Sequence, residues 1–135
     1  MALLEWNNSL SVGVPSIDAQ HCVLISLLND LHDAMLNGNA QNRTGPLLRS
    51  LVSYTRDHFT TEEAMMASAG YSQLKEHRNQ HLALTRKVEH YALRYERGES
   101  ALNLQLLTFL RDWITTHILV DDMAYAPTLK QHNLR

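Results

Sequence analysis

The chain has 135 residues, 19% of them charged, with a formal net charge of -2 and a pI near 6.4. This length fits one domain with a buried core and leaves no room for a second. Because the charges are scattered, the sequence shows no basic patch for nucleic acid or for an anionic membrane, and we expect neither partner.

The sequence shows no signal for export or for membrane anchoring. Residues 1–42 contain no Lys or Arg, and no apolar run approaches the roughly 20 residues that a membrane-spanning helix needs. The single cysteine, Cys22, excludes an internal disulfide and fits a reducing compartment. We therefore expect a cytoplasmic protein.

The first 15 residues predict an arm rather than a helix. They lack helical periodicity and contain Gly13 and Pro15, yet they carry several leucines and Trp6. Apolar side chains of this kind more often pack across a core than extend into water. We expect an N-terminal arm that lies against the domain.

The region from about residue 17 to 37 predicts the first helix, with Gly38 as its C-terminal stop. His21 lies on its apolar stripe, which recurs at steps of three, four and seven residues. His32 returns to the same side, but about 16 Å further along the axis, too far to share a metal with His21. The apolar members of the stripe are Ile17, Leu24, Leu28, Leu31 and Met35.

A second helix is predicted to start at Gly45 and Pro46, after a polar loop, and to end near Gly70. His58 and Glu62 lie four residues apart on its inward stripe, so they project from one face as a pair. The whole stripe consists of Leu48, Leu51, Thr55, His58, Glu62 and Met65.

A third helix is predicted from Ser72, a suitable N-cap, to Gly98. It has the most regular pattern in the chain, and His77 and His81 form a second pair four residues apart. Its stripe consists of Leu74, His77, His81, Leu84, Val88, Tyr91 and Tyr95.

A fourth helix is predicted from about Ser100, and a short helical piece follows near Pro127. Its inward residues are Leu106, Leu110, Trp113, Ile114 and His117. Four amphipathic helices joined by short loops indicate an all-α fold, an antiparallel up-down-up-down four-helix bundle with the N-terminal arm and a short C-terminal helix.

Histidines and acids on the four helices supply more ligands than one tetrahedral zinc ion takes. The candidates are His21, His58, Glu62, His77, His81 and His117, with Asp121 or Asp122 as a second carboxylate. A lone histidine on an apolar stripe is usually a hydrogen-bonded core residue, but a buried Glu62 needs a partner, and the joint pattern favours two metal ions bridged by carboxylates. Imidazole with carboxylate suits iron, manganese or zinc, and a single cysteine excludes sulfur-ligated clusters.

The spacing after His117 leaves two acids open. On a regular helix Asp121 shares the face of His117, whereas Asp122 lies about 140° away. Asp122 is therefore a ligand only if the helix widens into a π-bulge at this point.

Apolar residues are predicted around the open coordination position that one of two six-coordinate ions would keep. They are Leu24, Phe59, Trp113, Ile118 and Val120. An apolar wall admits dioxygen or nitric oxide and offers nothing to hold a polar substrate. Ordinary core packing is the alternative interpretation of the same residues.

The combined pattern resembles the hemerythrin family, and most closely the single-domain bacteriohemerythrins. The matching features are Trp6, the run GVPSIDAQH that ends at His21, HxxxE at 58–62, HxxxH at 77–81, and HxxxxD at 117–122 followed by Tyr125. The resemblance covers essentially all of residues 1–135 and implies one hemerythrin-like domain.

The resemblance implies a non-heme di-iron centre that binds dioxygen reversibly. By motif position, His77, His81 and His117 would hold one iron, His21 and His58 would hold the other, and Glu62 and Asp122 would bridge the two. Dioxygen would bind at the iron held by two histidines. The choice of Asp122 over Asp121 predicts an irregular helix between residues 117 and 122.

The predicted function is oxygen binding, for storage, delivery or scavenging, in a protein that is not an enzyme. The first alternative is sensing of oxygen or nitric oxide through a separate partner. Others are turnover of peroxide or nitric oxide at the same centre, and plain iron storage. Mixed and polar outer helix faces favour a monomer.

Overall fold

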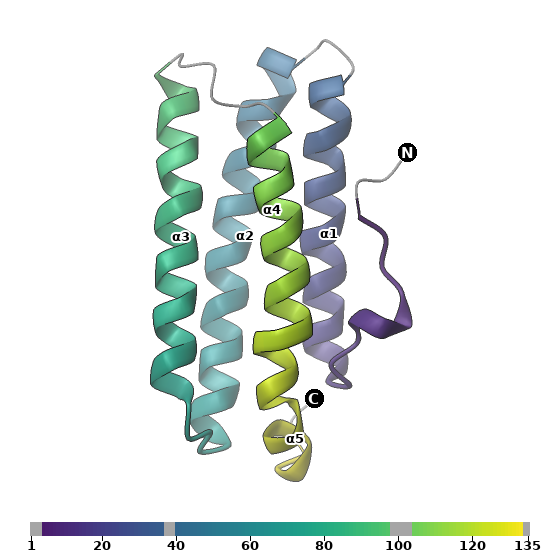
Figure 1. Ribbon diagram of the computed structural model, residues 1–135, viewed down its shortest axis with the longest axis vertical. Helices are drawn as coiled ribbons and strands as arrows, with labels where there is room; N and C mark the ends of the chain where they lie inside the picture. Colours follow the sequence, from purple (N-terminus) through teal and green to yellow (C-terminus); the bar gives the residue numbers. More distant parts are fainter. Residues whose placement is uncertain (1–3, 37–39, 98–103, 134–135) are drawn as a thin grey trace.

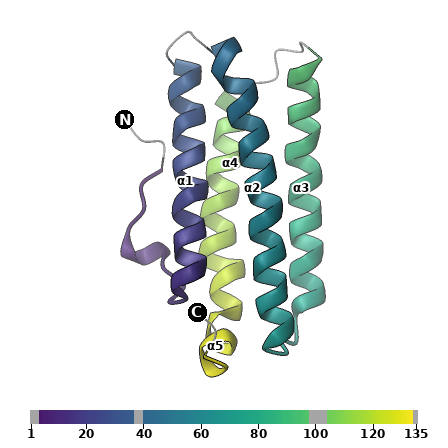
Figure 2. The ribbon, with the colours of Figure 1, turned by 180° about the vertical axis from the view of Figure 1, so that it is seen from behind.

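Four long antiparallel helices form a bundle in the computed structural model (Figures 1 and 2). The structure describes residues 4–36, 40–97 and 104–133. The helices are α1 (Pro15–Leu36), α2 (Ala40–Ser68), α3 (Leu74–Glu96) and α4 (Leu104–Thr116), and the π-helix η2 (His117–Asp122) joins α4 to the short helix α5 (Met123–Gln131). The predicted all-α up-down-up-down bundle is confirmed, and no strand occurs among the described residues.

The N-terminal arm lies along α1 (Figure 1), and hydrogen bonds with side chains of that helix hold it there. The Leu4 N–H donates to Asn29 Oδ1 at 3.0 Å, and Asn29 Nδ2 donates to the Leu4 carbonyl at 2.8 Å. In the first turn of α1, Asp18 accepts from the Val12 N–H at 2.8 Å and from the Ser11 hydroxyl. The arm contains the short 3-10 helix η1 (Asn8–Leu10), and its buried side chains are Leu10, Val12 and Val14. These contacts confirm the predicted packed arm.

The core lies on the inward stripes that the sequence predicts. Buried apolar side chains of α1, α2 and α4 meet along the bundle axis, and each has less than a tenth of its surface exposed. They include Ile17, Leu24, Leu28, Leu31, Leu48, Leu51, Leu110, Trp113 and Ile114. The sequence also predicts Leu106 and Tyr95 on inward stripes and a helix start near Ser100. These side chains lie outside what the structure describes.

The start of the second helix was predicted wrongly. Helix α2 begins at Ala40, so residues 40–44 are helical rather than part of a loop, and Pro46 lies inside the helix. Proline removes one amide donor and is costly in a helix interior, yet the polar residues before it have ordinary helix propensity, and α2 continues through it. Helix α3 begins at Leu74, close to the predicted start at Ser72.

Gly70 ends α2 as predicted, in the left-handed conformation that glycine adopts without steric cost. Its φ is +68°, and the Tyr71 N–H donates to the Met66 carbonyl at 3.0 Å, which is the hydrogen bond of a Schellman motif. The two other glycines predicted as helix stops, Gly38 and Gly98, lie outside the described residues.

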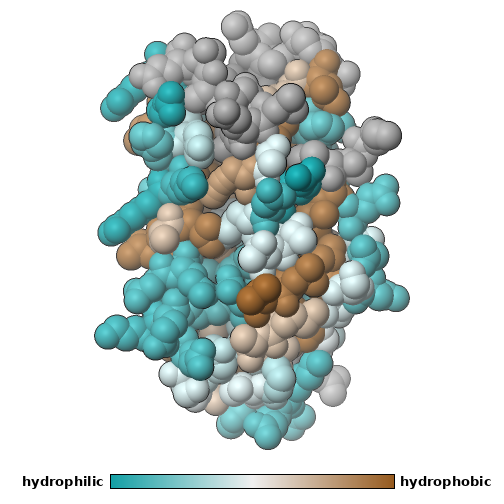
Figure 3. All heavy atoms as spheres, viewed as in Figure 1, coloured by the Kyte–Doolittle hydropathy of each residue, from teal (hydrophilic) through white to brown (hydrophobic). Residues whose placement is uncertain are grey.

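The molecular surface mixes hydrophilic and hydrophobic residues on the face shown in Figure 3. Within the described ranges, none of the helices combines the length and the apolar character that crossing a membrane requires. The more exposed large apolar side chains are Val23, Leu36, Leu82, Leu93, Leu119 and Val120.

Candidate metal centre

Seven polar side chains from α1, α2, α3 and η2 meet in the interior of the bundle. All are buried, with 0 to 4% of their surface exposed. They are His21, His58, Glu62, His77, His81, His117 and Asp122, and their candidate ligand atoms form two overlapping groups. Such a concentration of buried polar groups is costly unless each finds a partner.

The two groups share both carboxylates. The three-histidine group consists of His77, His81 and His117 with Glu62 and Asp122, and the two-histidine group consists of His21 and His58 with the same two acids. In each group the candidate ligand atoms lie within 4.8 Å of one another. This division, with the carboxylates between the groups, is the one that the family resemblance implies.

Each carboxylate directs its two oxygens to different groups. Asp122 Oδ1 is 3.0 Å from His117 Nε2, and Asp122 Oδ2 is 2.9 Å from His21 Nε2. Glu62 Oε1 is 2.8 Å from His58 Nε2, and Glu62 Oε2 is 3.1 Å from His81 Nε2. A carboxylate in this position can bridge two cations, one at each oxygen.

The close contacts fit ligands of a shared cation better than hydrogen bonds. His58 Nε2, Glu62 Oε2, His77 Nε2 and both Asp122 carboxylate oxygens make no hydrogen bond to any described residue, despite these short distances. Two atoms bound to one metal at about 2.1 Å and at right angles lie about 3.0 Å apart. The spacing and the unpartnered buried atoms therefore fit a pair of metal ions.

The π-helix decides which aspartate enters the cluster. In η2 the helix widens over His117–Asp122, which turns Asp122 inward and leaves it fully buried. Asp121 instead accepts from the outward Nδ1 of His117 at 3.2 Å. The irregularity expected from the family resemblance is present, and regular helical geometry would have selected the wrong acid.

Further side chains hold the cluster from outside. Glu63 accepts from His81 Nδ1 at 3.0 Å, and Gln20 accepts from His58 Nδ1 at 2.6 Å. The buried Tyr125 donates its O–H to Glu62 Oε1 at 3.0 Å. Sequence reasoning did not assign roles to Glu63, Gln20 or Tyr125, because the packing between helices decides which neighbours of a ligand reach it.

The charges of the cluster stabilise one another. Burial disfavours the charged form of His21, but the carboxylates of Asp122 and Glu62 outweigh it and raise the pKa of His21 to about 9. Burial also disfavours ionised Glu62, yet the surrounding imidazoles, first that of His58, hold its pKa well below the usual value. Without metal, protons on the imidazoles therefore balance the buried carboxylates.

Replacing Tyr125 by phenylalanine is expected to destabilise the metal-free protein by about 1.5 kcal/mol, because a hydrogen bond to a charged acceptor is lost. Chemical denaturation measures this change. The control is Tyr71→Phe, since the partly exposed Tyr71 packs edge-on against Tyr125 at a ring distance of 6.4 Å. Equal effects of the two substitutions would show that the Tyr125 hydroxyl does not stabilise Glu62.

Aromatic rings cover the three-histidine side of the cluster. Phe59 stacks on His81, with ring centroids 3.7 Å apart and planes 4° apart, and Trp113 stacks on His117 at 5.9 Å. Leu24 and Ile118, also predicted as an apolar wall, are buried in the core. Val120 does not belong to this wall, because its side chain is 61% exposed. The widened turn of η2 presents Val120 to solvent.

A family model described as "Hemerythrin HHE cation binding domain" matches residues 12–129. A bacteriohemerythrin of Stenotrophomonas maltophilia is 38% identical over 98% of this chain and 85% of its own length. A bacteriohemerythrin of Methylococcus capsulatus is 32% identical over 96% of this chain and 98% of its own length.

The fold also matches solved structures. A crystal structure of wild-type hemerythrin superposes with a TM-score of 0.89 and 31% identity, covering 95% of this chain and 98% of the other. The likeness therefore extends over the bundle and over the segments that supply the buried cluster.

Proposed function

Since the chain belongs to the hemerythrin family, we propose that its buried cluster holds two non-heme iron ions and that the pair binds dioxygen reversibly. The observation that carries this proposal is the division of the oxygens of Glu62 and Asp122 between a three-histidine and a two-histidine group. Three histidines on one side and two on the other leave the second ion with one ligand fewer. That ion is the proposed position for dioxygen.

The protein positions the metal ligands and excludes water from the centre. When bound, the iron pair would supply the electrons that dioxygen takes up and returns. Glu62 and Asp122 set the separation of the two groups, and the Tyr125 hydroxyl holds Glu62 in place. Phe59 and Trp113 shield the imidazoles. A dry, rigid surrounding of this kind favours reversible binding over reaction with solvent.

The proposed function is tested by cycling the iron-loaded protein between vacuum and air. We expect an optical band that appears with oxygen, disappears when oxygen is removed, and returns over repeated cycles. A spectrum that changes once and never reverts would contradict reversible binding.

We infer that the chain does not turn its ligand over. The aromatic residues that pack on the cluster histidines, Phe59 and Trp113, carry no acid or base, and the Tyr125 hydroxyl is already engaged with Glu62. Sustained consumption of peroxide or nitric oxide in the presence of a reductant, faster than autoxidation, would contradict this inference. The single domain, the monomeric state and the cytoplasmic location stay predictions of the sequence.

Metal uptake is expected to release protons in a pH-dependent manner. At pH 7 the metal-free protein keeps His21 protonated, because its pKa is about 9. A metal ion binds neutral imidazole, so uptake must displace this proton, and the displacement is lost as the pH rises through about 9. Calorimetry in buffers of different ionisation enthalpy measures the release. We expect release to fall and apparent affinity to rise between pH 7 and pH 10, whereas a release that is constant over this interval would contradict the assignment.

A further inference from the structure

The outward nitrogens of the cluster histidines have unequal partners. In the three-histidine group, His81 Nδ1 lies 3.0 Å from Glu63 Oε2, and His117 Nδ1 lies 3.2 Å from Asp121 Oδ2. A carboxylate accepts hydrogen bonds, so each imidazole donates from Nδ1 and presents the lone pair of Nε2 to the cluster. Two of the three imidazoles are therefore supported by negative charge.

The two-histidine group lacks this support. His58 Nδ1 donates to the neutral amide oxygen of Gln20 at 2.6 Å. The buried Nδ1 of His21 has no hydrogen-bond partner among the residues that the structure describes. The two groups thus differ in the charge behind their imidazoles as well as in the number of imidazoles.

Glu63 is itself held in position on the surface of the bundle. Arg78 Nε donates to Glu63 Oε1 at 3.1 Å, which leaves Oε2 directed at His81. Glu63, Arg78, Phe59 and His81 line a groove of about 440 Å³ between α2 and α3. Because Phe59 stacks on the face of His81, the ring is fixed both by its face and by its outward nitrogen.

We propose that Glu63 and Asp121 are positioning residues that make the three-histidine ion the more tightly held of the pair and favour its more oxidised state. The inference rests on the two-ion centre proposed above. A carboxylate that accepts from the outward N–H of an imidazole fixes the ring and strengthens its donation to a metal. Removing such a partner typically weakens metal binding about 10- to 100-fold.

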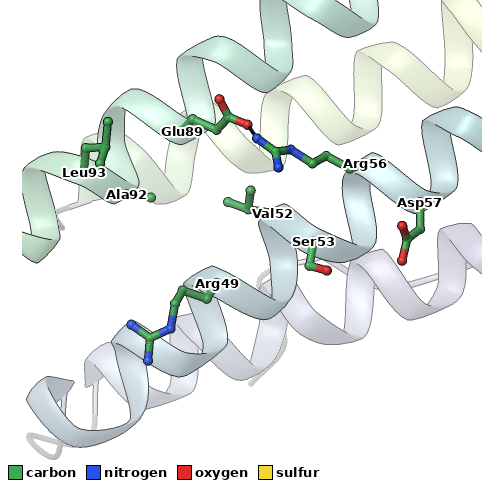
Figure 4. A pocket seen from close by; sticks show the side chains of 8 residues that line it. All are labelled: Arg49, Val52, Ser53, Arg56, Asp57, Glu89, Ala92 and Leu93. Carbon is green, nitrogen blue, oxygen red and sulfur yellow. Dashed lines mark ion pairs between the residues drawn. The ribbon is translucent and has the colours of Figure 1, made fainter.

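Stepwise titration with zinc, which has no redox chemistry, tests the proposal on the metal-free protein. We expect Glu63→Gln and Asp121→Asn each to weaken the tighter step about 10-fold or more and to leave the weaker step unchanged. Gln20→Glu, which places a carboxylate behind His58, is expected to tighten the weaker step. Glu89→Gln is the matched control, because Glu89 pairs with Arg56 across the same two helices (Figure 4) and belongs to neither group of candidate ligands.

Two further readouts separate positioning from general stability. In the zinc-loaded protein, the His81 Nδ1 proton is expected far downfield in the NMR spectrum of the wild type and shifted upfield in Glu63→Gln. In the iron-loaded protein, a tenfold loss of preference for the oxidised state raises the midpoint potential by about 59 mV. The inference would be overturned if Glu63→Gln and Asp121→Asn both left the two zinc-binding steps and the midpoint potential unchanged, and if Glu63→Gln also left the His81 proton shift unchanged. Binding of fewer than two zinc ions by the wild type would overturn the proposed centre instead.

Discussion

The Glu62→Ala variant is expected to lose both metal ions. Glu62 is fully buried and directs one oxygen to each group, so no other side chain can take over its bridging position. Its removal also leaves the surrounding imidazoles without a balancing charge, and we expect the metal-free variant to be less stable by about 3 kcal/mol. Iron per chain after anaerobic reconstitution and desalting measures the first effect, and chemical denaturation measures the second.

Two variants keep this prediction independent of folding. Glu62→Gln retains the shape of the side chain but removes its charge, and it is expected to lose the ions while keeping a helical circular dichroism spectrum. Glu89→Ala removes a carboxylate that pairs with Arg56 outside the cluster, and it is expected to keep both ions. A folded Glu62→Gln protein with the full iron content would contradict the bridging role.

The adjacent aspartates of η2 are expected to respond very differently to the same substitution. Asp122→Asn should lose at least one ion, because Asp122 is fully buried and its two oxygens serve different groups. Asp121→Asn should still bind two ions at micromolar protein concentration, with reduced affinity, because Asp121 contacts only the outward nitrogen of His117. Iron content of the two reconstituted variants distinguishes them.

The reverse result would contradict the role of the π-helix. Loss of iron from Asp121→Asn, with full iron content in Asp122→Asn, would mean that the bound state contains a regular helix with Asp121 inward. Both positions carry aspartate, with the same charge and the same intrinsic helix propensity. The comparison therefore isolates the direction in which each side chain points.

The helices and most of the cluster could be predicted because both depend on local periodicity. Histidines such as His77 and His81 occupy stripe positions next to apolar ones, so the same pattern that places the core also places them. Regular spacing could not select Asp122, since it predicts Asp121, and only the resemblance to a family pointed to the irregular turn. Regular helical geometry therefore identifies a pair of cluster residues four positions apart, such as His77 and His81, but it does not identify His117 and Asp122, which are five positions apart.

The remaining errors and omissions depend on contacts between elements. Glu63 follows Glu62 in the chain, but only the position of α3 shows that its side chain reaches His81. Val120 was placed in the interior because it is apolar and close to His117, whereas the widened turn exposes it. The early start of α2 was missed because Pro46 is a common helix start and here lies within the helix.

Anaerobic titration of the metal-free protein with ferrous iron tests the central claim most directly. The seven buried side chains, arranged as two groups that share Glu62 and Asp122, predict uptake that ends at two ions per chain. An end point of one ion per chain, or uptake that continues well beyond two, would contradict the proposed pair.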